Sequence, residues 1–253
     1  MELIVLGSSG AFPAAGGAAS GYLLRQDGFD LWIDCGTGTL ANLQRHVPYH
    51  SIDAILVSHE HPDHCLDLYP LFIARLFHPD HLDALPVHAP SGVFDRVGSL
   101  ERDQEGGRMR DVFSFQTVEP GASFEIGPFS VRTTLLPHWV PNIGTRLEAD
   151  GVAVAYTGDT GPAEGIVDIG RDADLLIAEA SWQDAHRNDD EAQPYHLTSR
   201  GAAEHAARAE AKRLMLSHFW PGLDRDVSRA QAREAYGGDI VLAAEGVSVE
   251  LGS

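Results

Sequence analysis

The chain has 253 residues, 43% of them hydrophobic, which is enough apolar material for a buried core. Because Asp and Glu number 37 against 18 Lys and Arg, the formal net charge is -19, and a surface of this sign repels the phosphate backbone of long nucleic acids. With two cysteines, no apolar run of about 18 residues and no signal-peptide pattern, neither a disulfide framework nor a membrane span is expected, and we predict a cytoplasmic protein.

Along the chain, short runs rich in β-branched residues are separated by Gly, Pro and Asp and by stretches with helical periodicity. We predict strands at Glu2–Leu6, Ser20–Arg25, Asp30–Asp34, Asp53–Ser58, Pro86–Ala89, Val112–Thr117, Phe129–Leu136, Asn142–Glu148, Val152–Thr157, Leu175–Glu179, Arg213–Ser217, Asp239–Ala243 and Val247–Leu251. We predict helices at Gly38–Arg45, Cys65–Phe77, Gly92–Leu100, Ala163–Ile169, Ser199–Ala209 and Val227–Ala235. Strands in runs with helices between them indicate an α/β protein in which packed sheets are covered by helices.

Two further features concern the organisation of the chain. Neither an internal repeat nor a linker is visible, so we expect residues 1–253 to form a single domain. The charged segment from Asp184 to Glu191 is predicted to be a solvated loop, and Thr198 with Ser199 is predicted to cap the helix that follows.

The stretch SHEHPDH, residues 58–64, places His59, His61, Asp63 and His64 between a predicted strand and a predicted apolar helix. Side chains in a turn at a strand end can converge on one point, whereas the same side chains inside a strand would alternate between two faces. Imidazole nitrogens and carboxylate oxygens are ligands that zinc and similar divalent metals accept. The turn therefore predicts metal binding, although two ions would each need further ligands from elsewhere in the chain.

Three later segments can supply those ligands, and each is a predicted strand end followed by a turn. His138 lies in TTLLPHW, Asp159 in VAYTGDT and His218 in RLMLSHF. A single histidine at a strand end is usually a core or surface residue. Three such residues in the same context, together with the histidine-rich turn, indicate a common site.

HEHPDH matches the HxHxDH motif of the metallo-β-lactamase superfamily, and the segments around His138, Asp159 and His218 resemble the later metal-ligand motifs of that superfamily in the same order. GSSGAFP near the N-terminus and LWIDCG around Asp34 resemble its opening strands, so the resemblance extends over essentially the whole chain. It implies an αββα sandwich, in which two mixed β-sheets are flanked by helices and the metals lie at one edge between the sheets.

The resemblance also implies how two divalent metal ions share these side chains. One ion is held by His59, His61 and His138, the other by Asp63, His64 and His218, and Asp159 bridges the two. Asp34 is implied to orient a ligand histidine. Zinc is the expected metal, and manganese and iron suit the same ligands.

The chemistry that follows from such a centre is metal-assisted hydrolysis. Two divalent ions roughly 3.5–4 Å apart lower the pKa of a bridging water and clamp the attacked and leaving oxygens of a phosphodiester. Asp63 is placed to bind metal and to orient the attacking hydroxide, and the spacing alone does not separate these roles. We therefore predict a metal-dependent hydrolase with Asp63 as a catalytic residue.

The branch of the superfamily is indicated by two segments. Zinc β-lactamases with a cysteine ligand in the fourth motif are disfavoured, because Asp159 stands there and neither cysteine is near it. PYHLTSRGAAEHA places His196 before a helix and resembles a histidine segment of ribonuclease Z-type phosphodiesterases. That resemblance implies that His196 contacts the scissile phosphate or protonates the leaving alkoxide, and a surface histidine near the helix cap is the alternative.

The expected substrate is small. In ribonuclease Z an inserted arm between the third and fourth motifs grips tRNA, whereas only residues 139–158 separate His138 from Asp159 here, enough for two strands and a turn at Asp150-Gly151. The chain looks most like the actinobacterial cyclic nucleotide phosphodiesterases of the superfamily, which implies hydrolysis of a 3′,5′-cyclic nucleotide. A ribonuclease Z-like tRNA 3′-processing endonuclease, a thioester or lactone hydrolase, and a non-catalytic metal-binding protein remain alternatives.

Several residues beside the expected ligands are candidates for substrate contact. Trp139 and Trp220 each lie close to a ligand histidine and could stack on a base, and Thr160 and Ser181 could contact phosphate. The expected partner is a small phosphodiester, with no membrane and no long nucleic acid. A homodimer is suggested by analogy only.

Overall fold

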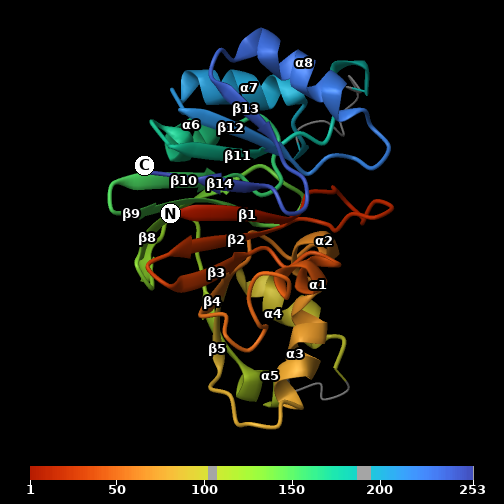
Figure 1. Ribbon diagram of the computed structural model, residues 1–253, viewed down its shortest axis with the longest axis vertical. Helices are drawn as coiled ribbons and strands as arrows, with labels where there is room; N and C mark the ends of the chain where they lie inside the picture. The colour runs from red at the N-terminus through yellow and green to blue at the C-terminus, as the bar shows by residue number, and fades with distance from the viewer. Residues whose placement is uncertain (102–106, 187–194, 253) are drawn as a thin grey trace.

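The computed structural model describes residues 1–101, 107–186 and 195–252, and it consists of two β-sheets with helices on their outer faces (Figure 1). In these residues one sheet has the strand order β14-β1-β2-β3-β4-β5-β6, and the other has the order β13-β12-β11-β10-β9-β8-β7. The strands are β1 Glu2–Gly7, β2 Gly21–Gln26, β3 Phe29–Ile33, β4 Ala54–Leu56, β5 Leu85–Ala89, β6 Phe113–Thr117, β7 Ser123–Ile126, β8 Phe129–Leu136, β9 Asn142–Ala149, β10 Val152–Tyr156, β11 Leu175–Glu179, β12 Arg213–Ser217, β13 Asp239–Leu242 and β14 Ser248–Glu250. The predicted αββα sandwich with two mixed sheets is confirmed.

Both sheets are built on one plan. In the first, β14, β1, β2 and β3 pair antiparallel, and β3, β4, β5 and β6 pair parallel. In the second, β7, β8, β9 and β10 pair antiparallel, and β10, β11, β12 and β13 pair parallel. Parallel strands need crossover connections, and the helices supply them.

The helices form the two outer layers. They are α1 Thr39–Leu43, α2 Pro62–Cys65, α3 Leu68–Leu76, α4 Ser91–Gly98, α5 Gly107–Val112, α6 Glu164–Gly170, α7 Ser199–Arg208 and α8 Arg225–Ala235, with a 3-10 turn η1 at Asp184–His186. The elements α1 to α5 lie beside the first sheet, and α6, α7 and α8 cover the second (Figure 1). Thr198 accepts a hydrogen bond from the Gly201 N–H, which confirms the predicted cap of α7.

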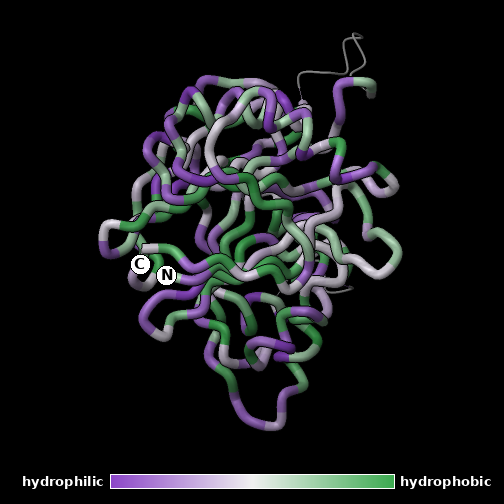
Figure 2. The backbone as a smooth tube through the Cα atoms, turned by 45° about the horizontal axis from the view of Figure 1, so that its top comes forward, coloured by the Kyte–Doolittle hydropathy of each residue, from purple (hydrophilic) through white to green (hydrophobic). Residues whose placement is uncertain are grey.

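The core has three layers, which match the two sheets and their covers. Between the sheets, Leu3 and Tyr22 of the first sheet pack with Phe129, Leu147 and Ile177 of the second, all with no exposed surface. Separate clusters join each sheet to its own helices. Full burial of a Leu, Ile or Phe side chain contributes roughly 1.5–3 kcal/mol, so the inter-sheet layer is a main source of stability. Figure 2 shows hydrophobic strand segments in the middle of the molecule and hydrophilic segments around them.

The predicted helix Cys65–Phe77 is wrong at its start. The structure has a single turn, α2, with Pro62 at its first position, and then a separate helix α3 that begins at Leu68. Proline is favoured there because the first helical N–H needs no partner inside the helix. Asp63 and His64 therefore lie on a short helix and not in an irregular turn.

Other elements differ from the prediction in extent or were missed. Strand β7 and helix α5 were not predicted, since a four-residue strand and a helix beginning at Gly107 give weak periodicity. Of the predicted strand Asp53–Ser58, the assigned strand β4 covers Ala54–Leu56; the Asp53 and Val57 N–H groups still bond to neighbouring backbone, and the Ser58 N–H is donated to the Asp34 carboxylate. Of the predicted loop 184–191, residues 187–191 lie outside the described part of the chain.

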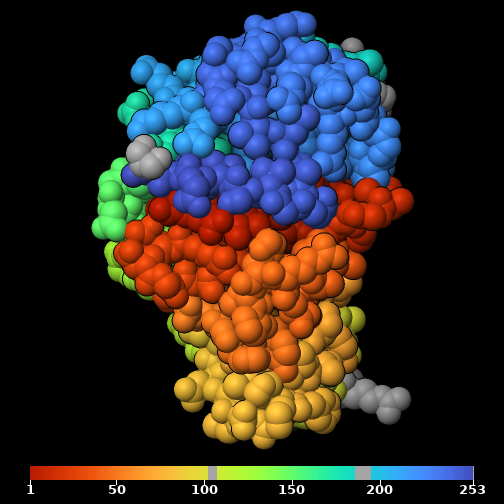
Figure 3. Space-filling view, viewed as in Figure 1, coloured from red at the N-terminus to blue at the C-terminus, as the bar shows by residue number. Residues whose placement is uncertain are grey.

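The predicted turn at Asp150-Gly151 is confirmed. Asp150 and Gly151 both have positive φ, 50° and 77°, and join β9 directly to β10. In the space-filling view the last strand lies against the first, in agreement with the register Glu2↔Glu250 (Figure 3). No helix among the described residues is long and apolar enough to cross a membrane.

Candidate metal centre

The seven side chains predicted as ligands come together where strands of both sheets end. His59 and His61 follow β4, and Asp63 and His64 stand on α2. The other three follow strands of the second sheet: His138 follows β8, Asp159 follows β10 and His218 follows β12. They form two adjacent groups able to hold metal ions, and Asp159 belongs to both. Their role as metal ligands remains a prediction.

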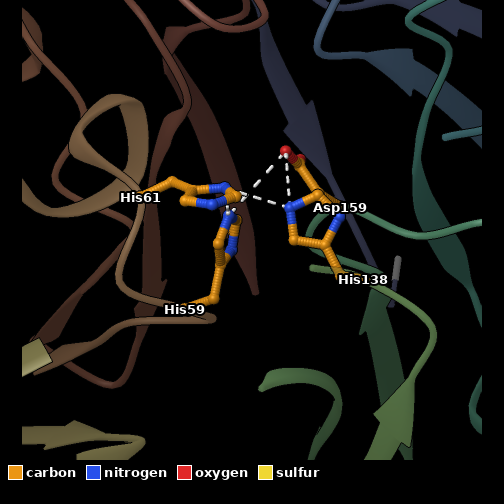
Figure 4. Close-up of side chains that lie close together, drawn as sticks. All are labelled: His59, His61, His138 and Asp159. Carbon is orange, nitrogen blue, oxygen red and sulfur yellow. Dashed lines mark hydrogen bonds and ion pairs between the residues drawn. The ribbon is translucent and has the colours of Figure 1, made fainter. Parts of the chain in front are cut away.

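The first group, termed the open group, consists of His59, His61, His138 and Asp159 (Figure 4). The His61 Nδ1 lies 3.1 Å from the His59 Nε2 and 3.0 Å from the His138 Nε2. The Asp159 Oδ2 lies 3.8 Å from the His59 Nε2 and 3.9 Å from the His138 Nε2. His61 is partly exposed, whereas the His138 side chain has no exposed surface, so this group meets solvent through His61.

The second group, termed the buried group, consists of Asp63, His64, Asp159 and His218, and all four are buried. The His218 Nε2 lies 3.2 Å from the Asp63 Oδ2 and 3.2 Å from the Asp159 Oδ2. The His64 Nε2 lies 3.2 Å from the Asp159 Oδ1. The two oxygens of Asp159 thus face different histidines of this group, and its Oδ2 also faces the open group.

Asp34 orients two of these histidines. Its Oδ2 accepts a hydrogen bond from the His64 Nδ1 at 2.7 Å and from the Ser58 Oγ at 2.8 Å. Because the Ser58 hydroxyl proton goes to Asp34, Ser58 Oγ is free to accept the proton of the His59 Nδ1 at 3.0 Å. Tyr156 also donates to Asp34, at 2.6 Å. Both histidines therefore turn their Nε2 atoms toward the centre.

Glu179 orients two further histidines, His196 and His218, and sequence reasoning missed it. Its Oε2 accepts the hydroxyl proton of Ser181 at 2.6 Å, which leaves the Ser181 Oγ to accept from the His218 Nδ1 at 2.8 Å. Its Oε1 lies 3.0 Å from the His196 Nδ1. Glu179 is the last residue of β11 and only 1% exposed. A buried glutamate at a strand end, two residues before a predicted contact residue, was the only signal available.

The chemistry of this donor set fits divalent cations. Burial lowers the pKa of His59 well below its ordinary value and lowers the pKa of His138 to about 4, so both rings are neutral near pH 7. The His64 Nε2 and the Asp159 Oδ1 are buried and have no hydrogen-bond partner among the described residues. Neutral imidazoles such as those of His59 and His138, together with buried carboxylate oxygens that lack a hydrogen-bond donor, are what a metal ion satisfies.

The charge of the buried group favours a cation as well. Burial alone lowers the pKa of His64, but the carboxylates of Asp159, Asp63 and Asp34 outweigh it and hold that pKa well above its ordinary value. For Asp159, burial raises the pKa, and His218 with His64 lowers it by more, so the carboxyl is ionised. Concentrated negative charge of this kind is neutralised when a divalent cation enters.

The backbone around the centre is unusually constrained. Asp34 and His218 both have φ of 56°, a left-handed conformation that costs roughly 1–3 kcal/mol for residues other than glycine. Gly36 approaches the helix α2 so closely that a Cβ there would lie 2.1 Å from the Asp63 carbonyl oxygen. The Ala11 N–H donates to the Asp63 Oδ2 at 2.8 Å, so the N-terminal loop also holds this carboxylate.

The remaining predicted contact residues divide into two sets. His196 lies beside the centre, with its ring 5.2 Å from the His138 ring and 5.8 Å from the His218 ring. Thr160 and Ser181 were expected to contact phosphate, but both are buried. The Thr160 hydroxyl donates to the Gly161 carbonyl and the Ser181 hydroxyl to Glu179, so neither is available to a substrate.

Comparison with known proteins agrees with this geometry. The sequence model described as the beta-lactamase superfamily domain matches residues 30–219. An uncharacterized protein of Mycobacterium leprae is 31% identical over 257 residues, which cover 99% of this chain and 89% of that protein. The ribonuclease Z of Haloferax volcanii is 28% identical over 306 residues, covering 99% of this chain and 95% of that enzyme.

Solved structures show the same arrangement of sheets and helices. The crystal structure of the metallo-beta-lactamase fold protein YhfI from Bacillus subtilis matches with a TM-score of 0.88, at 27% identity and with 99% of each chain covered. The short form of human tRNase Z matches with a TM-score of 0.78, at 25% identity and with 99% of each chain covered.

Proposed function

The chain belongs to the beta-lactamase superfamily, as a metallo-hydrolase, and from this premise we propose that it hydrolyses small phosphodiesters such as 3′,5′-cyclic nucleotides. The observation that carries the proposal is the pair of ligand groups that share Asp159, with the dyad of Glu179 and His196 beside them. Two adjacent cations suit a phosphodiester, which presents oxygens to both and carries negative charge.

We propose two divalent ions, zinc in the first instance, one in each group. When bound, such ions activate water for attack and stabilise the charge that develops on the phosphoryl oxygens. His59, His61 and His138 would hold the ion of the open group. Asp63, His64 and His218 would hold the other, and Asp159 would serve both.

The chain's own residues supply the proton transfers. Burial lowers the pKa of His196, but Glu179 outweighs it and raises that pKa to about 9, so the imidazole is protonated near pH 7. A protonated His196 can bind a phosphoryl oxygen and donate its Nε2 proton to the leaving alkoxide. Asp63 is ionised and anchored by the Ala11 N–H, so it can accept a hydrogen bond from the attacking water and orient it.

Three observations support a small substrate. The hairpin of β9 and β10 takes up residues 142–156 of the interval between His138 and Asp159, and the five remaining residues leave no room for an inserted arm there. The alignment with the Haloferax enzyme spans 306 residues, more than the 253 of this chain, so that relative contains inserted segments. The net charge of -19 opposes the counterion-release affinity on which tRNA binding depends.

A ribonuclease Z-like tRNA endonuclease is the second candidate, because the relatives include ribonuclease Z enzymes. A turnover panel on protein reconstituted with zinc, manganese or iron separates the two. It contains 2′,3′- and 3′,5′-cyclic nucleotides, linear dinucleotides, precursor tRNA, and thioester and lactone substrates. We expect turnover of cyclic nucleotides and no cleavage of precursor tRNA. Cleavage of precursor tRNA, or turnover of thioesters or lactones alone, would contradict the proposal.

His196→Ala tests the proton donor within the same panel. We expect kcat to fall by about 100- to 10,000-fold, the usual contribution of a general acid, with metal content unchanged. His46→Ala is the matched control, since His46 is exposed on the loop after α1 and should leave kcat as it is. A His196→Ala enzyme with the parent kcat would show that His196 has no catalytic role.

A further inference from the structure

The rim of the open group carries a tryptophan with much of its surface in contact with solvent. Trp139 follows the ligand histidine His138 directly, and 59% of it is exposed. Its ring centroid lies 5.4 Å from that of His138, 5.5 Å from that of His196 and 6.4 Å from that of His61. Ligand sites commonly place aromatic side chains beside a few polar groups, and an exposed indole face can stack on a planar group.

The position of this indole is fixed relative to the metal centre. Its ring lies 5.1 Å from the Tyr195 ring, at an interplanar angle of 41°. The Tyr195 carbonyl accepts the Nδ1 proton of His138 at 3.2 Å, so the residue that supports Trp139 also orients a ligand histidine. Trp139 is therefore a preformed wall beside the open group.

The second tryptophan at the rim differs in this respect. Trp220 is 38% exposed and stacks on Trp182, with centroids 5.0 Å apart and planes at 24°. Phe12 packs edge-on against it at 5.7 Å. These partners already cover ring surface of Trp220, whereas the ring contacts of Trp139 to the site are tilted or edge-on and leave more than half of it exposed.

We propose that Trp139 stacks on a planar heteroaromatic base of the substrate, so that the site takes nucleotides and not phosphodiesters with aliphatic substituents. This inference rests on the proposed phosphodiesterase function and names its substrate class. In a nucleotide the base lies one sugar away from the phosphate, so a phosphate held at the open group and His196 places the base at the rim. Stacking then covers the exposed indole, and it tolerates different bases because each has a π face.

The test compares the binding of AMP and ribose 5-phosphate to the zinc-loaded protein by titration calorimetry. The two ligands share the phosphate and the sugar and differ in the base. We expect AMP to bind about 5- to 150-fold more tightly, which corresponds to the ~1–3 kcal/mol of one base–aromatic stack. Trp139→Leu should bring this ratio near one, while Trp139→Phe, which keeps a π face, should retain most of it.

Trp220→Leu is the matched control, because it removes a tryptophan of the same rim and should keep the ratio. Quenching of tryptophan fluorescence by AMP should be lost in Trp139→Phe and kept in the control. Equal affinity for the two ligands, no binding of AMP, an unchanged ratio in Trp139→Leu, or loss of the ratio in Trp220→Leu alone would each overturn the inference. Hydrolysis of bis-p-nitrophenyl phosphate reports on the proposed function separately, and its absence would refute that function whatever the binding ratio.

Discussion

The two halves of the metal centre are built from similar side chains but differ in their surroundings. All four residues of the buried group are shielded from solvent, and its two histidines are oriented, His64 by Asp34 directly and His218 by Glu179 through the Ser181 hydroxyl. In the open group, His61 is partly exposed, and Trp139 and His196 lie beside the buried ring of His138. On the proposed function, we expect a division of work, in which one half is held by the fold and the other contacts the substrate.

The pattern of orienting hydrogen bonds explains how one chain produces both halves. Asp34 and Glu179 each accept a direct bond from a histidine and reach a second histidine through a serine hydroxyl. Asp34 is completely buried and Glu179 is 1% exposed, so both networks lie in a low-dielectric interior where such bonds are strong. His61 has no comparable bond through its outer nitrogen among the described residues, and it is the member of the open group with the least support.

The largest expected effect comes from a substitution that disrupts both ligand groups at once. Asp159→Ala removes the carboxylate that belongs to both groups, so we expect metal content to fall toward zero and kcat to fall by about 1000-fold or more, since bound metal supplies several kcal/mol of transition-state stabilisation. Elemental analysis and kinetics measure the two quantities. Asp168→Asn, an exposed carboxylate on α6, is the control. Full metal content in Asp159→Ala would contradict the shared position.

A pair of variants separates the halves. His61→Ala should leave about one tightly bound ion per chain and a normal unfolding temperature, because His61 is half-exposed. His64→Ala should release the ion of the buried group and also lower the unfolding temperature, because it removes a ring with no exposed surface from a packed site. Mass spectrometry of the native protein and calorimetry give both readings. Identical behaviour of the two variants would refute the distinction between the groups.

The pH dependence of kcat tests His196, which lies beside both ligand groups. The raised pKa of His196 means that its proton is retained up to about pH 9, so kcat should fall as the pH rises through that value. The raised pKa of His196 also contributes to the stability of the fold. This contribution is fully present below the ordinary pKa of about 6.5 and is lost as the pH rises through about 9. Glu179→Gln removes the charge that opposes burial, so the alkaline limb should move to lower pH. A limb that does not move would show that another group titrates.

The smallest expected effect concerns a hydrogen bond that supports the buried group through Asp34. Tyr156 donates to Asp34 at 2.6 Å from the opposite sheet and does not contact a proposed ligand atom directly. Tyr156→Phe should weaken metal binding by no more than about 10-fold, at the low end for residues that orient ligands. Competition with a chelator of known affinity measures this change in metal affinity. Phe129→Tyr cannot serve as a control, because Phe129 is fully buried. An effect as large as that of Asp159→Ala would mean that Tyr156 supports the whole centre.

Much of this arrangement could be predicted from the sequence, for physical reasons. His59, His61, Asp63 and His64 are close along the chain, and a dense group of ligand side chains after a strand is visible without any tertiary information. The strand ends near His138, Asp159 and His218 could be read from β-branched runs. Alternation and turn residues also indicated most strands, including the hairpin at Asp150-Gly151.

Apart from Asp34, which the family resemblance implied, the residues that orient the ligands could not be found in this way. Glu179 and Tyr156 bond to residues far away in the chain, and Ser58, although it is next to His59, takes its orientation from Asp34, 24 residues earlier. Burial reversed the expectation for Thr160 and Ser181, because a hydroxyl near a ligand in sequence can point into the protein and be used there. Short elements such as β7 gave too few residues for a periodic pattern.

The contact of Gly36 with the carbonyl of Asp63 has a practical consequence for anyone who alters this molecule. Two main-chain segments touch there, so no library of substitutions at residue 36 can find an acceptable side chain without displacing α2. Attempts to change specificity should leave the loop from residue 34 to residue 36 untouched. Variation belongs at residue 139, whose side chain is largely exposed and is not one of the proposed ligands.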